Sequence, residues 1–238
     1  MKITRRQSLK VIISSLGAPL LLRGEAVAQE PFQFSERMSG RIAEDTYNTN
    51  VYPPSRTRAI YDFERGEELG TSELSFSGFM VIDDLDKFEE DPRHVADYKG
   101  EVTYNGETVP ISEGKVKLFS SEYPEYANQV RNLIYYIPFS TTTGEYVLSG
   151  YKKVKIFNLN SVDFVKDMTT LYTHLHQGPF VGPLDSPELG PMLGAGILRY
   201  DIRDIFGLIQ SCQPISAAPR FFTIIAGEAM SAILPPIL

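Results

Sequence analysis

Short runs of alternating apolar and polar residues, separated by Gly- and Pro-rich turns, recur along most of this 238-residue chain. Alternating side chains point to opposite faces of a strand, so each run predicts a β-strand with one buried face. The dipeptide Asn105-Gly106 predicts a tight hairpin, because both residues tolerate positive φ. The main strands are expected at 74–82, 98–104, 131–139, 145–151, 169–176 and 193–200, with shorter ones at 108–111 and 114–119.

Eight or nine strands joined mostly as antiparallel neighbours predict an all-β fold. An open meander would expose two unpaired edges, and closure removes both. We therefore expect a closed or nearly closed antiparallel barrel of about eight strands, calycin-like, which can hold side chains or one small ligand. Apolar spacing adds a helix near 201–210 and a C-terminal helix within 221–234, and acidic residues are placed to cap a short helical turn at 83–88.

The N-terminus has the features of an export signal. The pair Arg5 and Arg6 lies in a segment that resembles the twin-arginine pattern, although Ser8 stands where a Phe is usual. The apolar run that follows is too short and too broken to remain as a membrane span, and Ala26 and Ala28 form a small-x-small cleavage site. We divide the chain into a signal peptide at 1–28, an extended segment at 29–58 and a single β-barrel domain at 59–238. The expected location is the periplasm or the exterior, reached by the twin-arginine route.

Charge and motif content exclude several classes of function. The net charge is −7, and loss of residues 1–28 removes five basic side chains and Glu25, which leaves −11. This argues against nucleic acid or an anionic lipid surface as partner. The single Cys212 excludes an internal disulfide. We expect no cofactor, because Gly194 and Gly196 lack the third glycine of a dinucleotide-binding loop.

Two of the three histidines, His174 and His176, share one face of the expected strand at 169–176. They could act in acid/base chemistry or bind a metal with a third ligand, for which His94 is the remaining histidine. The alternative is a polar strand face that points to solvent or borders a cavity, and we expect no metal site. Candidates for ligand contacts are Tyr172, His174, His176 and Tyr200, and no residue is a firm catalytic candidate.

The opposite face of the same strand carries Leu171 and Leu175, which we expect to be buried. In the next strand, Gly194 and Gly196 share a face, where the missing side chains allow close packing or leave room for a ligand.

Four separated motifs resemble a known family: Asp83–Val102 (DDLDKFEEDPRHVADYKGEV), Tyr146–Val154 (YVLSGYKKV), Asp167–Gly178 (DMTTLYTHLHQG) and Leu193–Ile205 (LGAGILRYDIRDI). In this order and spacing they resemble a β-rich accessory domain joined to GMC-type flavin oxidoreductases of the cholesterol-oxidase-like kind. The resemblance covers roughly 34–230, but the flavin domain is absent. It implies an accessory or substrate-handling role and carries over no catalytic residue.

These observations leave three functional hypotheses. The first is an exported accessory or binding module for a hydrophobic, steroid- or lipid-like molecule that works with a GMC-type flavoprotein and has no catalytic activity alone. The second is a small β-barrel isomerase or cyclase with His174 or His176 as its acid/base. The third is an escort or structural subunit of an exported flavoprotein. A cavity in the barrel would favour the first two.

Overall fold

The computed structural model describes residues 30–44, 56–120, 130–155, 166–200 and 210–231. The expected signal peptide at 1–28 lies wholly outside these residues. The expected helix near 201–210 also lies outside them, except for residue 210. The strands are β1 (Phe32–Glu44), β2 (Ser72–Ile82), β3 (Val95–Tyr104), β4 (Glu107–Pro110), β5 (Gly114–Ser120), β6 (Val130–Thr141), β7 (Gly144–Lys155), β8 (Thr170–Gln177) and β9 (Met192–Arg199).

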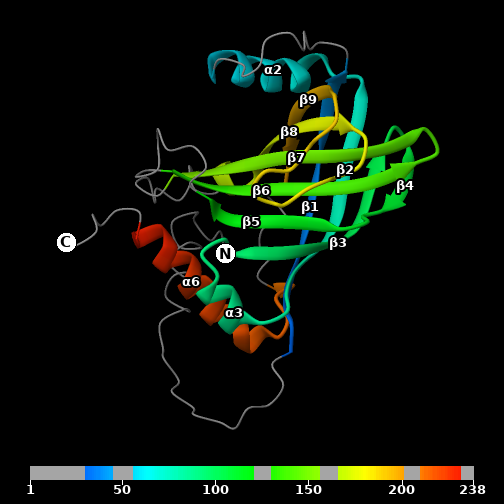
Figure 1. Ribbon diagram of the computed structural model, residues 1–238. Coiled ribbons are helices and arrows are strands. Elements are labelled where there is room, and N and C mark those ends of the chain that lie inside the picture. Colours follow the sequence, from blue (N-terminus) through cyan, green and yellow to red (C-terminus); the bar gives the residue numbers. More distant parts are fainter. Residues whose placement is uncertain (1–29, 45–55, 121–129, 156–165, 201–209, 232–238) are drawn as a thin grey trace, which may run out of the picture.

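Eight of these strands form a closed antiparallel barrel, as the alternating pattern predicts (Figure 1). The strands follow the order β2-β1-β9-β8-β7-β6-β5-β3, and a pairing of β2 with β3 closes the ring. The short β4 pairs with β3 outside this ring. Asn105 and Gly106 connect β3 to β4 with φ values of 50° and 84°, which confirms the hairpin turn. Closure leaves the ring itself without an unpaired edge.

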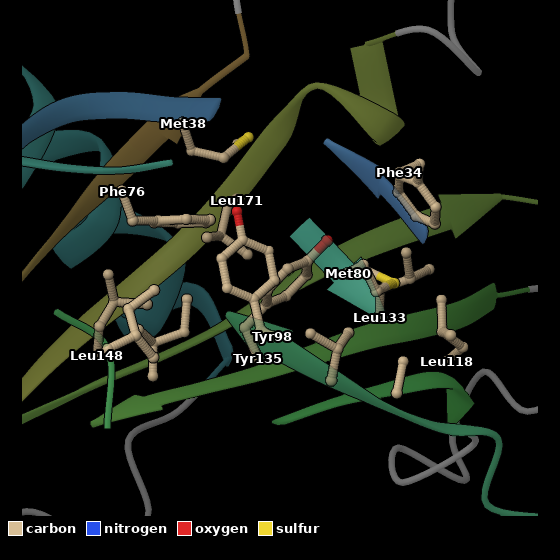
Figure 2. Packing of buried hydrophobic residues seen from close by; sticks show 14 of the residues in the cluster. Phe34, Met38, Phe76, Met80, Tyr98, Leu118, Leu133, Tyr135, Leu148 and Leu171 are labelled. Carbon is tan, nitrogen blue, oxygen red and sulfur yellow. The ribbon is translucent and has the colours of Figure 1, made fainter. Parts of the chain in front are cut away.

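Large side chains fill the middle of the barrel. Figure 2 shows aromatic and aliphatic residues from opposite walls meeting in the interior, with Tyr98 and Tyr135 near its centre and Phe76 and Leu171 beside them. All four are at most 1% exposed. Eight strands enclose a space that side chains alone can fill. The interior is therefore a packed core.

The helix α2 (Arg56–Leu69) packs against the outside of β1 and β9 and was not predicted from the sequence. Its close approach depends on Gly66, because a Cβ there would lie 1.9 Å from the carbonyl oxygen of Ala195 on β9. Phe63 packs beside it against Ala195 and Ile197. A bulkier residue than glycine would push the helix away from the barrel.

Two further helices, α3 (Leu85–Glu90) and α6 (Ala218–Ser231), lie together at one end of the molecule (Figure 1). The Asp84 carboxylate accepts hydrogen bonds from the first-turn backbone of α3, which confirms the capped turn. Arg220 of α6 forms ion pairs with Asp86 and Glu89, and Phe221 packs among aromatic rings of β1 and α3. The α6 helix confirms the helix expected in the C-terminal region. A 3-10 turn, η3 (Ile215–Ala217), precedes it.

The segment 29–58 contains β1, which lies in the barrel wall between β2 and β9. The barrel therefore begins before residue 59, and the segment expected to be only an extended entry contributes a full strand to the ring. None of the helices in the described residues is both long and apolar enough to span a membrane.

Candidate functional site

His174 lies on the outer face of β8, beneath α2. Its imidazole stacks on the Phe63 ring with a centroid distance of 4.5 Å and an interplanar angle of 30°. Burial, with a smaller contribution from the charge of His176, lowers the pKa of His174 to about 3. The ring is thus a neutral packing element at ordinary pH.

His176 follows on the same face and is fixed by two hydrogen bonds. Its Nδ1 donates to the carbonyl oxygen of Gly190 at 3.0 Å, since that oxygen can only accept. Its Nε2 then accepts from the Ser149 hydroxyl at 3.1 Å. Burial lowers the pKa of this imidazole as well, although the bond to Gly190 acts in the opposite direction. Both ring nitrogens are therefore occupied within the fold.

Of the other two candidate residues, Tyr172 lies on the same strand face as the histidines and Tyr200 does not. Tyr172 shares the outer face of β8 with the histidines, stacks on Tyr151 at 5.4 Å and has the Lys153 ammonium 4.7 Å from its ring centroid. Tyr200, which follows β9, packs against the inward-facing core and also lines the groove over β1–β4 described below. The four residues expected as ligand contacts thus do not converge on one site. In the described part of the chain, no group of three or more His, Cys, Asp or Glu side chains is arranged to hold a metal.

The faces expected for β8 and β9 are present. Leu171 and Leu175 point inward and are fully buried, as predicted. A Cβ on Gly196 would lie 2.0 Å from the carbonyl oxygen of Arg41, and one on Gly194 would lie 2.5 Å from that of Ala43. The missing side chains therefore serve close packing of β9 against β1 and leave no room for a ligand there.

A charged pair lies inside the barrel, among the aromatic rings. Lys152 of β7 donates a hydrogen bond to the Glu36 carboxylate of β1, and both side chains are at most 3% exposed. Tyr98 donates to the backbone carbonyl of Glu36 at 3.0 Å, and the Lys152 ammonium lies 5.2 Å from the Tyr135 ring centroid. Each charge offsets the cost of burying the other.

The two tyrosines of this cluster, Tyr98 and Tyr135, have raised pKa values. Burial is the main cause for both Tyr98 and Tyr135, and the negative charge of Glu36 adds to it, so both stay protonated. The second oxygen of Glu36, Oε2, has no hydrogen-bond partner among the described residues and is shielded from solvent. Sequence reasoning did not identify this cluster. An isolated Glu in β1 and a Lys in a Lys-rich strand carry no local sign of burial.

A groove of about 750 Å³ lies over β1, β2, β3 and β4. Phe79 gives the groove a large apolar side chain that remains 44% exposed. The residues that line the groove are Ser35, Glu36, Arg37, Ser77, Gly78, Phe79, Gly100, Glu101, Thr108, Val109, Pro110 and Tyr200.

Strand register sets the arrangement of the groove. Gly78 of β2 is paired with Gly100 of β3, so two neighbouring strands carry no side chain at this level. A Cβ at either position would meet the backbone of the other strand at less than 3 Å, so the close approach of the two strands here requires glycine. The backbone of Gly78 and Gly100 lies beside Phe79 and beside the neighbouring polar pair, Ser77 and Glu101. The groove therefore combines three apolar side chains, Phe79, Val109 and Pro110, with a larger number of polar residues.

Comparisons of the chain with protein families, curated proteins and solved structures found no match.

Proposed function

We propose that the chain is an exported binding module for a hydrophobic molecule and that the ligand lies in the groove over β1–β4. The single observation that carries this proposal is the groove itself. Its volume of about 750 Å³ falls within the range of small-molecule sites, and the exposed Phe79 gives it an apolar contact surface.

The packing of the barrel argues against a ligand inside it, so the cavity that would favour a ligand-based function is not found within the described strands and the proposal depends on the outer groove. Fully buried side chains such as Tyr98, Tyr135 and Phe76 occupy the interior, where a ligand of similar size would have to displace them. The histidines give the isomerase hypothesis no support, because His174 is stacked beneath α2 and both nitrogens of His176 are hydrogen-bonded.

The sequence resemblance supports a further element of the proposal, a GMC-type flavoprotein as the protein that exchanges ligand with this module. Under this proposal, export by the twin-arginine route would bring the folded module to the same compartment as that partner. Catalysis would then belong to the flavoprotein.

The proposal is tested by titrating the purified protein with a fluorescent sterol. We expect saturable binding that Phe79→Ser weakens about tenfold, since burial of a Phe side chain contributes about 1.5–3 kcal/mol. Leu69→Ser is the matched control, because Leu69 is also exposed but lies on α2. Absence of saturable binding, or equal affinities for the two variants, would contradict the proposal.

A further inference from the structure

The groove contains a row of polar side chains that crosses three strands. Arg37 of β1 is in register with Ser77 of β2, and Ser77 is in register with Glu101 of β3. All three residues line the groove. Because residues in register lie about 5 Å apart on neighbouring strands, Arg37 and Glu101 stand on opposite sides of Ser77, about 10 Å from each other at their backbones.

The cation in this row has no partner in the described residues. Three other arginines there are bound by carboxylates: Arg93 by Asp91, Arg199 by Glu67, and Arg220 by Asp86 and Glu89. Arg37 is exposed and forms neither an ion pair nor a hydrogen bond through its side chain with any described residue. Glu101 instead accepts a long hydrogen bond of 3.4 Å from the Ser77 hydroxyl. The guanidinium is thus available to a ligand.

The apolar surface begins next to this guanidinium. Phe79 points outward two residues after Ser77 on β2, and Pro110 is in register with Glu101 at the far side of the row. Val109 adds a half-buried apolar side chain. A molecule that lies over these residues would bring one end to Arg37.

We infer that the groove binds an amphipathic ligand with an apolar body and a carboxylate head group, and that Arg37 binds the carboxylate. This inference rests on the proposed function and names the class of its ligand. A guanidinium presents two parallel N–H donors to a carboxylate, which gives a geometry that an alcohol cannot match. Arg37 is the one cationic side chain among the described residues that line the groove, beside Glu101 and the Glu36 that is paired with Lys152, so selection of an anion over a neutral molecule of the same shape depends on Arg37.

The test compares pairs of ligands that differ only in the head group. One pair is a fluorescent long-chain fatty acid and its alcohol, and the other is a steroid carboxylic acid and its alcohol. We expect the protein to bind the acid of at least one pair more tightly, and the better pair shows whether the body is flexible or rigid. Arg37→Ala should weaken binding of the acid about tenfold or more and leave the alcohol unchanged.

Arg41→Ala is the matched control, because Arg41 is an exposed arginine on the same face of β1 outside the groove. Arg37→Lys should restore some of the affinity, since it keeps the charge without the two parallel donors. If Phe79→Ser weakens binding while Arg37→Ala has no effect, the head-group inference is wrong and the groove proposal remains. If no ligand binds, or if Phe79→Ser has no effect, both are wrong.

Discussion

At the scale of single residues, the two histidines illustrate how position decides chemistry. Their spacing indicates a shared strand face, and they do share one. That face is the outer face of the barrel, and the contacts with Phe63 and with the carbonyl of Gly190 leave both imidazoles half-buried. A neutral, half-buried imidazole that packs against other side chains contributes to stability only while it remains neutral.

We therefore predict that the protein loses stability in mild acid through His174. Its pKa is about 3 in the folded protein and near 6.5 when unfolded, so protons bind preferentially to the unfolded state below pH 6.5. The contribution is fully present above pH 6.5 and declines as the pH falls towards 3. From this group alone, the free energy of unfolding should be about 2 kcal/mol lower at pH 5 than at pH 7.

Urea unfolding of the wild type and of His174→Phe at the two pH values measures this effect. The variant cannot titrate there and should show a pH dependence smaller by about 2 kcal/mol. Tyr172→Phe, a neighbouring change on the same strand face, should keep the dependence of the wild type. An unchanged dependence in His174→Phe would rule out His174 as the source.

At the scale of elements, α2 depends on the absence of one side chain. The helix covers β1, β9 and His174, and at Gly66 a Cβ would overlap the backbone of β9. Alanine is the better residue for an isolated helix by about 1 kcal/mol. In this position a methyl group would overlap the carbonyl oxygen of Ala195. Helix propensity and packing therefore favour opposite residues.

We predict that Gly66→Ala destabilises the protein by about 1–3 kcal/mol in spite of its higher helix propensity, because the helix must move away from β9. Thermal unfolding measures the loss, and hydrogen exchange should show faster exchange in α2. Glu68→Ala, at an exposed position of the same helix, is the matched control and should be neutral or slightly stabilising. A stabilised Gly66→Ala variant would show that the contact is not tight in solution.

At the scale of the whole molecule, the fold has a packed interior and presents its groove on the outside. Closure of the ring places the glycine pair Gly78 and Gly100 and the exposed Phe79 on one outer region spanned by four strands. A protein of this design can fold completely before it meets its ligand. That property fits the proposed export as a folded chain.

The export proposal predicts that replacing Arg5 and Arg6 together by Lys retains the precursor in the cytoplasm, because the arginine pair is the feature that resembles the recognition element. Fractionation followed by immunoblotting measures the share of protein in each compartment. Arg23→Lys is the matched control, since it makes the same exchange near the expected cleavage site and should leave export unchanged. Normal export in cells that lack the twin-arginine translocase would contradict the proposal.

The sequence by itself determined the described strands other than β1, the hairpin at Asn105-Gly106, the capped turn at Asp84 and the burial of Leu171 and Leu175. Each of these depends on residues close together in the chain, where alternation, positive φ or a capping carboxylate acts directly. The count of strands was then enough to predict a closed barrel.

Only the tertiary structure decided which buried residues meet. Lys152 and Glu36 are 116 positions apart, and the closure of the ring brings them together. The cover over His174 and the glycine-paired groove at Gly78 likewise come from separate elements. Local patterns assign side chains to faces, whereas strand register and closure set the distances between faces, so the polar interior and the groove could not be predicted from the sequence.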